Sequence, residues 1–417
     1  MTDTQSDFQQ PLKGLKVLEL SQIMAGPTCG LMLADMGADV YKVEKVPLGD
    51  DARNYGRPSD AGIPPSFMML NRGKKSIGIN IKSDAGRAAL LRMAMQADVL
   101  TENFRLGVIE RLGLGYDVLK ELNPSLIYCS ITGYGREGPL AQKGGFDLIL
   151  QAFSGLISVT GEEGGEPVKP GVSIADVNAG ILAALGVLAA YVHRLRTGCG
   201  QRVDTSLLQA SLQHMYWYAA AYFSRGVVAK PSGTAHPLIA PYQVYRCRNG
   251  RIAIGGANQA NWERIADVLG HAEWRSDSRF ATADLRLANR GTLARLIDAV
   301  LATDDVESWL SRFDDACVPA GPVQNVAQAL EHEQARAVRM VVDVDAPDGG
   351  KTRALGLPIL FNGQTRIASR AAPRVGQDTE DILREFGFTD GEIEDLIACG
   401  AVLQHRSPVD STAIANS

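Results

Sequence analysis

Asp176 is the residue of this chain whose type and position most favour chemistry. It lies in the segment Gly171-Val-Ser-Ile-Ala-Asp-Val-Asn-Ala-Gly180, where a strand-like stretch gives way to a long apolar helix. The helix dipole and the unpaired N–H groups of a first helical turn favour the ionised form of a carboxyl group there. An ionised carboxylate near a cleft can act as a nucleophile and form a covalent acyl intermediate. The alternative is an ordinary helix cap, which the local sequence alone favours.

The composition is that of a soluble enzyme. The chain has 417 residues, 21% of them charged, and a formal net charge of −5. This length predicts two or more domains, and the acidic balance argues against a dedicated nucleic-acid binder. The polar N-terminus predicts neither a signal nor a transit peptide, and the longest uncharged apolar run, 179–192, is shorter than the roughly 20 residues that cross a bilayer. We therefore expect a cytoplasmic protein without membrane association.

No metal or redox centre is expected from the remaining residue types. The six cysteines form no Cys-x-x-Cys pair and predict buried thiols in a reducing compartment, and the six histidines lie far apart. The first strand is not followed by Gly-x-Gly-x-x-Gly, and the chain has no Gly-x-x-x-x-Gly-Lys-Ser/Thr loop. We therefore expect neither an ordinary dinucleotide site nor a tightly bound cofactor.

Strands and helices alternate in the first half of the chain. Hydrophobic patterns predict strands at 15–20, 38–44, 76–81, 98–103 and 126–131, and helices at 28–36, 83–96 and 179–196. Ser83 is the expected cap of the second helix, and Gly198 the expected stop of the third. This alternation predicts an α/β, Rossmann-like domain whose mostly parallel sheet is covered on both faces.

The pattern of predicted strands and helices changes after about residue 225. Two strands, 242–246 and 250–255, predict a hairpin around Asn249-Gly250, and helical patterns follow from 262 to about 313. A strand returns near 340–344 and a helix at 389–399. We expect a large domain over 1–224, a smaller α+β domain over 225–328, and a return to the large domain with a loose tail over 329–417.

The chain also resembles a known family over nearly its whole length. The matching segments, in order, are Leu18-Glu-Leu-Ser-Gln-Ile-Met-Ala-Gly-Pro27, Gly37-Ala-Asp-Val-Tyr-Lys-Val-Glu44, Asn71-Arg-Gly-Lys-Lys-Ser-Ile77, Glu102-Asn-Phe104, Ile131-Thr-Gly-Tyr-Gly135, Gly145-Phe-Asp147, Ile174-Ala-Asp176 and Thr197-Gly-Cys-Gly-Gln201. Together they resemble the family III CoA-transferases, which include formyl-CoA transferase, carnitine CoA-transferase and α-methylacyl-CoA racemase. Gly233-Thr-Ala-His236, Pro241-Tyr-Gln243 and Val318-Pro-Ala-Gly-Pro322 look most like the succinate–glutarate type.

The resemblance implies that Asp176 is the acyl-carrying nucleophile of a CoA-transferase that moves CoA between carboxylic acids. A dicarboxylic donor such as succinyl-CoA is expected, with acyl-CoA as substrate. It also implies CoA contacts at Ile23, Lys45, Asn71, Arg72, Lys74, Lys75, Asn103, Phe104, Arg105 and Arg111. Cations suit the phosphates of CoA, although each lysine or arginine taken singly is equally an ordinary surface charge. Relatives form dimers of interlocked subunits, so a homodimer is expected as well.

Two departures from the family pattern bear on the substrate. Met24 stands just before Ala25, with Gln22 two residues further back, which argues against a formyl or oxalyl substrate. The racemases of the family carry a histidine where this chain has Phe146, and phenylalanine cannot move a proton. Racemisation is therefore the weaker alternative. Asp147 either positions or protonates the reacting carboxylates, or caps the helix that follows it.

A glycine-rich segment in the second domain is a further candidate. Gly255, Gly256 and Asn258 follow a strand, and such a loop either shields a reactive anhydride from water or makes a tight turn. His236 is a candidate contact for a distal carboxylate. A thioesterase is disfavoured because 171–175 lacks the last glycine of Gly-x-Ser-x-Gly. A non-catalytic acyl-CoA-binding protein would fit the basic residues but would not need Asp176.

Overall fold

The computed structural model describes residues 10–56, 62–347, 349–365 and 367–405. The chain forms two compact units. Apart from the undescribed residues, unit 1 takes in Met1–Leu156, Pro170–Ala219 and Gln334–Ser417, and unit 2 takes in Ile157–Lys169 and Ala220–Glu333. Residues 157–169 belong to unit 2, although they lie within the range 1–224 that the sequence predicts for the large domain.

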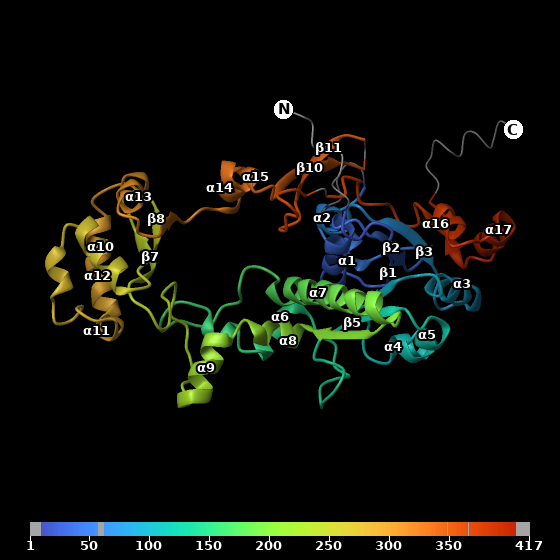
Figure 1. Ribbon diagram of the computed structural model, residues 1–417, viewed down its shortest axis with the longest axis horizontal. Helices are drawn as coiled ribbons and strands as arrows, with labels where there is room; N and C mark the ends of the chain where they lie inside the picture. Colours follow the sequence, from blue (N-terminus) through green and yellow to red (C-terminus); the bar gives the residue numbers. More distant parts are fainter. Residues whose placement is uncertain (1–9, 57–61, 348, 366, 406–417) are drawn as a thin grey trace. The chain divides into compact units, whose positions relative to one another are not determined.

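Unit 1 is built on one seven-stranded sheet of order β12-β3-β2-β1-β4-β5-β6 (Figure 1). Its pairs are parallel except that β12 runs antiparallel to β3. The mostly parallel sheet is therefore confirmed, and the order 3-2-1-4-5-6 is that of doubly wound nucleotide-binding folds. The strands are β1 (Lys16–Glu19), β2 (Asp39–Glu44), β3 (Lys75–Ile79), β4 (Val99–Glu102), β5 (Ile127–Thr132), β6 (Arg202–Ser206) and β12 (Val402–Leu403).

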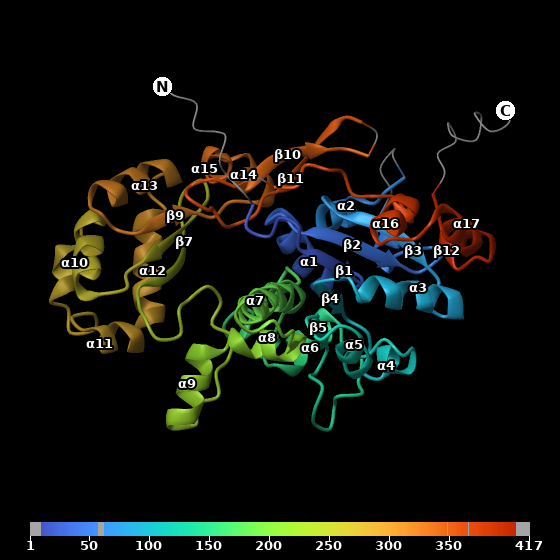
Figure 2. The ribbon, with the colours of Figure 1, turned by 45° about the vertical axis from the view of Figure 1, so that its right-hand side comes forward.

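Helices cover both faces of this sheet. Those of unit 1 are α1 (Ala25–Asp35), α2 (Pro65–Asn71), α3 (Asp84–Ala94), α4 (Val108–Arg111), α5 (Tyr116–Leu122), α6 (Asp147–Phe153), α7 (Ile174–Thr197), α8 (Leu207–Gln213), α16 (Thr379–Glu385) and α17 (Asp390–Ala398), with the 3-10 helix η1 (Asp51–Asn54). In Figure 2, α1 and α7 lie on one side of the strand row and α3 and α5 on the other. Unit 1 also holds the antiparallel pair β10 (Val341–Asp345) and β11 (Lys351–Leu355), and α9 (Tyr216–Arg225) and α15 (Glu333–Ala337) span the unit boundaries.

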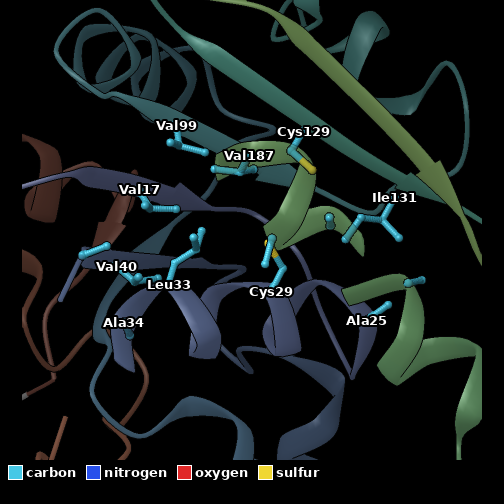
Figure 3. Close-up of a cluster of buried hydrophobic side chains, with 14 of the residues drawn as sticks. Val17, Ala25, Cys29, Leu33, Ala34, Val40, Val99, Cys129, Ile131 and Val187 are labelled. Carbon is cyan, nitrogen blue, oxygen red and sulfur yellow. The ribbon is translucent and has the colours of Figure 1, made fainter. Parts of the chain in front are cut away.

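Neighbouring residues of each strand enter opposite cores. Val17 belongs to the core beneath α1 and α7, shown in Figure 3, while Leu18 belongs to the core beneath α3, α5 and α16. Val99 and Leu100 divide in the same way. Because successive side chains of a strand point to opposite faces, a strand buried on both faces needs an unbroken apolar run. Strands β1 and β4 meet this need at these positions, whereas β2 also buries the charged Lys42 and Glu44, which are paired within the fold.

Helix ends follow the expected signals where local chemistry sets them. The Ser83 hydroxyl accepts a hydrogen bond from the N–H of Gly86 at 3.1 Å, so the predicted cap of α3 is confirmed. Gly198 ends α7 in the left-handed conformation, with φ of 75°, as predicted. Helix α7 begins at Ile174 and not at Ala179, which brings Asp176 into its first turn.

Helix α7 packs against α1 through small side chains. Its buried residues are alanines, one valine and Gly180. A β-carbon at position 180 would lie 2.5 Å from the carbonyl oxygen of Ala25, so only glycine allows the two backbones to approach this closely. By length and composition α7 also meets the criterion for a membrane-crossing helix, which core helices of soluble proteins meet too. Its buried face packs on α1, the end of the sheet and α8.

Unit 2 is a small α+β unit with its own core. An antiparallel sheet of β7 (Tyr242–Arg246), β8 (Arg251–Gly255) and β9 (Ala320–Pro322) confirms the predicted hairpin around Asn249-Gly250. Trp262, Phe280 and Phe313 are buried in the core beside it. The helices are η2 (Ile157–Val159), α10 (Gln259–Val268), η3 (Ala272–Arg275), α11 (Ala283–Ala288), α12 (Arg290–Leu301), α13 (Val306–Asp315) and α14 (Val326–Glu331).

The sequence predicted that the cysteines are buried, but only some of them are. Cys29, Cys129 and Cys247 are buried, but Cys199, Cys317 and Cys399 are exposed. Cys199 follows the end of α7, Cys317 follows α13 and Cys399 follows α17. The prediction of buried thiols was wrong for these three because each lies where a helix gives way to a surface turn.

Candidate active site

Two neighbouring pockets open along the carboxyl edge of the large sheet. In doubly wound sheets ligands bind outside this edge, where the strand order reverses, and here the reversal lies between β1 and β4. The first cavity, of about 250 Å³, contains Asp176 and is called the Asp176 pocket below. The second, of about 270 Å³, contains Lys45 and is called the Lys45 pocket. Gln22 and Phe104 line both pockets, so the two lie next to each other along the edge.

The Asp176 pocket is built from the segments that leave three parallel strands. Its lining residues come from the turn after β1, the loop after β4, the end of β5 and the loop before α6, and they include Gln22, Ile23, Met24, Ala25, Asn103, Phe104, Arg105, Leu106, Thr132, Gly133, Lys143, Gly144, Gly145 and Phe146. Asp176 reaches the same cavity from the first turn of α7. Sequence reasoning grouped Asp176 with Ile23, Asn103, Phe104 and Arg105, and the structure brings these five residues together.

The neutral form of the Asp176 carboxyl group is favoured more strongly than the sequence suggested, because the pKa of this group is raised. Burial, and then the charge of the nearby Asp147, raise the pKa of Asp176 from 3.8 to about 7. Asp176 is the third residue of α7, and the N-cap is Ser173, so Asp176 is not the cap of its own helix. The expectation that the helix terminus keeps it ionised was wrong, because desolvation and a like charge outweigh the helix dipole here.

Asp147 connects the start of α7 to α6. Its Oδ1 accepts hydrogen bonds from the backbone N–H of Ala175 at 3.0 Å and of Asp176 at 3.4 Å. Its Oδ2 accepts a hydrogen bond from Nε2 of the buried Gln151 at 2.5 Å. Asp147 is the first residue of α6, whose N-cap is Phe146, so it does not cap the helix that follows it. It caps α7 instead, and thereby fixes the backbone of the candidate nucleophile.

The turn after β1 is clamped by the loop after β4. The Asn103 Oδ1 accepts from the N–H of Gln22, and its Nδ2 donates to the Gln22 carbonyl, both at 2.9 Å. The side chain of Asn103 therefore shapes the pocket wall and has little capacity left for a ligand. Phe104 lies at the junction of the two pockets.

Two cations in the Asp176 pocket have no protein partner among the described residues. Arg105 is exposed and lies against the backbone at Gly144, where a β-carbon would come within 2.9 Å of its Nε. Lys143 is exposed on the loop before α6. Sequence reasoning missed Lys143, because it lies outside the segments that carry the resemblance. The sequence signal that was available is its place directly before Gly144-Gly145, whose small residues let a loop approach the pocket.

The Lys45 pocket lies outside β1, β2 and β3 and is closed on one side by α4. Lys45 pairs with Asp51, and Lys82 lines the far end of the cavity. Val108 and Leu112 flank it, and Arg111 is exposed on the same helix. The pocket is apolar on its α4 side. Its strand side carries Lys45 and Lys82 together with the carboxylates Glu44 and Asp50, which are engaged with Arg53 and Lys42. An apolar wall beside exposed lysine side chains suits a ligand with a flat apolar part and attached phosphates.

Three predicted CoA contacts are interior residues. Asn71, Arg72 and Lys74 are buried. Nζ of Lys74 donates to both oxygens of Glu19 at 2.8 and 3.1 Å and to Oδ1 of Asn71 at 2.9 Å, and Arg72 forms a bidentate ion pair with Asp35. Their side chains are buried and make these contacts within the fold, so the structure gives them a role in the fold. Their contacts to CoA stay predictions.

Lys75 does not belong to either pocket. It is the first residue of β3 and pairs with Glu385 at 2.9 Å. The pockets lie at the opposite, carboxyl end of the strands, where Ile79 leads into Asn80. The sequence motif placed Lys74 and Lys75 together, but it could not show at which edge of the sheet they emerge.

The remaining candidates lie in unit 2. Gly256 is held by a hydrogen bond to the carbonyl of Pro241, and a β-carbon there would lie 2.6 Å from that oxygen. Asn258 caps α10, and the N–H of Gly255 donates to Pro319. The His236 ring lies 5.2 Å from the Tyr242 ring, centroid to centroid, in a tilted arrangement, and burial lowers the pKa of its imidazole. The roles of Gly255, Gly256, Asn258 and His236 towards a substrate stay predictions.

The sequence pattern of CoA-transferase family III matches residues 12–379. The chain is 34% identical to the succinyl-CoA:glutarate CoA-transferase of Mus musculus, over 96% of this chain and 92% of the mouse protein. It is 36% identical to the succinate--glutarate CoA-transferase of Agrobacterium fabrum, over 93% of this chain and 98% of the Agrobacterium protein. A CAIB/BAIF family protein from Brucella suis superimposes with a TM-score of 0.80 at 37% identity, over 90% of this chain and 99% of that one. The chain belongs to CoA-transferase family III and is a CoA-transferase.

The raised pKa of Asp176 predicts a pH-dependent effect of removing its charge. Below its ordinary pKa of 3.8 the carboxyl group is neutral in both the folded and the unfolded chain. As the pH rises to about 7 the unfolded chain loses this proton first, so the stability of the wild type falls relative to an asparagine variant. We expect Asp176→Asn to raise the Tm, by a margin that grows from pH 5 to pH 8. Thermal unfolding at both pH values measures this margin, with Asp395→Asn at an exposed position as control. A margin that is constant or shrinks with pH would contradict the account.

Proposed function

We propose that this CoA-transferase works through a covalent intermediate on Asp176. The observation that carries the proposal is the place of this carboxyl group, half-buried in a pocket at the carboxyl edge of the sheet that also holds Arg105 and Lys143, two cations without a protein partner among the described residues. A carboxylate whose pKa is raised is a better nucleophile than an ordinary one and is still ionised in about half of the molecules near neutral pH. Family membership agrees with this chemistry.

The reaction is a chain of carboxylate and thiolate exchanges. The ionised oxygen of Asp176 attacks the thioester carbonyl of the donor, the C–S bond breaks, and CoA thiolate leaves a mixed anhydride behind. The thiolate then attacks the aspartyl carbonyl, releasing the donor acid and leaving an aspartyl-CoA thioester. The acceptor carboxylate repeats the two steps in reverse order and leaves as the new acyl-CoA. Each step exchanges one carboxylate for one thiolate, so no net proton is consumed.

The two neighbouring pockets suit the two ends of an acyl-CoA. The Lys45 pocket has an apolar wall for a ring system and the cations Lys45 and Lys82 for phosphates, with Arg111 exposed beside it. The pantetheine arm would pass Gln22 and Phe104 into the Asp176 pocket. There Arg105 and Lys143 supply positive charge for a phosphate or for the free carboxylate of the acyl group.

A dicarboxylic acyl group is the proposed cargo. The mouse and Agrobacterium relatives carry succinate and glutarate in their names. Unpaired cations near a nucleophile provide a binding partner for a second carboxylate, which a monocarboxylic acyl group would leave unused. We propose succinyl-CoA as donor and a dicarboxylate such as glutarate as acceptor. Racemisation is the weaker alternative because the Phe146 side chain at the pocket cannot move a proton.

The assembly we propose is a homodimer in the cytoplasm. Helix α7 is strongly apolar, yet only 39% of its most apolar 18-residue stretch is buried within the chain. Its exposed side chains recur at helical spacing and are Val177, Ile181, Leu185, Val192 and Leu195. Exposed apolar surfaces of this kind mark interaction sites. A second copy of the chain is the proposed occupant of this face, and the overall composition agrees with a soluble cytoplasmic protein.

Light scattering of the purified full-length protein tests the proposed assembly. A mass of two chains is expected at micromolar concentration, because an apolar face of this extent would otherwise remain in contact with water. Leu185→Glu, in the middle of the exposed face, should shift the mass toward that of one chain. A wild type that remains a monomer at all concentrations would overturn the proposal.

Replacement of the nucleophile tests the proposed function. Asp176→Asn should abolish transfer of CoA from succinyl-CoA to glutarate, by at least about 10³-fold, because no carboxylate oxygen can then form the anhydride. The wild type, incubated with succinyl-CoA alone and trapped with hydroxylamine or borohydride, should show modification on the peptide that contains Asp176. Binding of CoA itself should survive in the variant, which separates loss of chemistry from loss of fold. Near-normal transfer by Asp176→Asn would refute the mechanism.

The two unpaired cations are tested by their effect on acyl-CoA binding. Arg105→Ala and Lys143→Ala should each raise the Kd for succinyl-CoA by about tenfold, since each removes a charge-assisted contact. Lys75→Ala is the matched control, because Lys75 emerges at the opposite edge of the sheet and should leave the Kd unchanged. Calorimetric titration gives the three values. Unchanged affinity in both pocket variants would show that these cations do not contact the ligand.

A further inference from the structure

Ile23, in the wall of the Asp176 pocket, has an unusual backbone conformation. Its φ is 70°, in the left-handed region. A β-branched residue is disfavoured there because its side chain collides with its own backbone, so the conformation persists only where the surroundings enforce it. Backbone strain of this kind is found at functional sites. The first question is therefore which contacts hold Ile23 in place.

The Asp50 carboxylate holds the backbone of Ile23 directly. The N–H of Ile23 donates to Oδ1 and Oδ2 of Asp50 at 3.0 and 3.2 Å. Asp50 is only 2% exposed, and its Oδ1 also accepts from the N–H of Ala52 at 2.9 Å, which caps η1. The carboxylate therefore ties the turn after β1 to the segment that follows β2.

A buried lysine supports both the carboxylate and the turn. Nζ of Lys42 lies 2.8 Å from Oδ2 of Asp50 and donates to the carbonyl of Ser21 at 3.0 Å. It also pairs with Glu19 at 3.0 Å, so its charge is satisfied inside the fold. The attraction of Lys42, which outweighs the cost of burial, lowers the pKa of Asp50 and keeps this carboxyl group ionised. The Lys42–Asp50 ion pair thus fixes the turn at two points, because Lys42 binds the carbonyl of Ser21 and Asp50 binds the N–H of Ile23.

The turn determines where the pocket wall and α1 begin. Gln22, Ile23, Met24 and Ala25 all line the Asp176 pocket, and Ala25 is the first residue of α1. Met24, the N-cap of α1, makes no capping hydrogen bond with its side chain, so the helix start receives no local support. Asp50 and Asn103 hold this wall from opposite neighbours of β1, on the β2 and β4 sides.

We propose that Asp50 is a positioning residue for acyl transfer, which keeps Ile23 in its left-handed conformation and the wall 22–25 in place opposite Asp176. The proposal rests on the function proposed above. Asp50 lines the Lys45 pocket and not the Asp176 pocket, so it acts through the backbone and not on the reacting atoms. A shift of the wall by about 1 Å would misalign a thioester bound against it, at a cost of up to about 100-fold in rate.

A purely structural role is the alternative explanation. Asp50 also neutralises Lys42 and caps η1, and its loss would destabilise the fold whether or not the wall matters for catalysis. The two explanations predict different effects of a substitution at residue 23. Glycine adopts a φ near 70° without strain, so with glycine at position 23 the wall needs less support from Asp50. If Asp50 had only a structural role, glycine at position 23 would not reduce the loss of rate caused by replacing Asp50.

The experiment measures formation of the aspartyl-CoA adduct on the full-length protein at saturating succinyl-CoA, by quenched mass spectrometry. Asp50→Asn should slow this step by about 10- to 100-fold, with a smaller change in the KM for succinyl-CoA. Asp50→Glu keeps the charge beside Lys42 but moves the acceptor away from Ile23, so it preserves the fold better and should slow the step as well. Adding Ile23→Gly to either variant should restore most of the lost rate, relative to Ile23→Gly alone.

The control and the outcomes separate the explanations. Asp378→Asn removes another buried carboxylate of unit 1, one that accepts from the N–H of Ser76, and should lower the Tm without slowing the adduct step. Adduct formation at the wild-type rate in Asp50→Glu, or a loss that Ile23→Gly leaves unchanged, would overturn the positioning role while the proposed function stands. Absence of any adduct in the wild type would instead overturn the proposed function, and the inference with it.

Discussion

The contact between Asp147 and the first turn of α7 is the interaction on which the site depends. It anchors the N–H groups of Ala175 and Asp176 to a neighbouring helix, and it places a second carboxylate close enough to raise the pKa of Asp176. A carboxylate that must attack a thioester has to be ionised yet poorly solvated. Burial and the like charge of Asp147 favour the protonated form, yet they leave Asp176 partly ionised near neutral pH. The same contact therefore fixes the backbone at Asp176 and raises the pKa of its carboxyl group.

The fold supplies the second constraint, which is close packing around the start of α7. Gly180 lets α7 approach α1 until the two backbones are in contact, and α1 itself begins at the pocket wall. The wall is tied to the strands on either side of β1, through Asp50 and through Asn103. Nucleophile and wall are thus positioned by neighbouring elements of one sheet. The reversal of strand order between β1 and β4 provides the opening between them.

Local chemistry in the sequence was sufficient for the sheet and for several helix ends. Alternating strands and helices predicted the parallel sheet, and the cap at Ser83 and the stop at Gly198 are confirmed. Burial could not be read from residue types. Arg72 and Lys74 were expected at the ligand because they are cations, but their partners Asp35 and Glu19 are 37 and 55 residues away and hold them in the interior. Lys143 was missed because its loop reaches the pocket only after the chain has folded. A cap of the following helix was one of two roles predicted for Asp147; it caps α7 instead, because sequence shows the adjacent helix and not the distant one.

Oxygen tracing tests the covalent mechanism most directly. The protein would be turned over with succinyl-CoA and glutarate labelled with ¹⁸O in its carboxylates, then digested, and the peptide containing Asp176 weighed. If the acceptor attacks an aspartyl-CoA thioester, the anhydride breaks on the acyl side and one labelled oxygen stays on Asp176. The account predicts this gain on that peptide and on no other. Formation of glutaryl-CoA with an unlabelled Asp176 would contradict it.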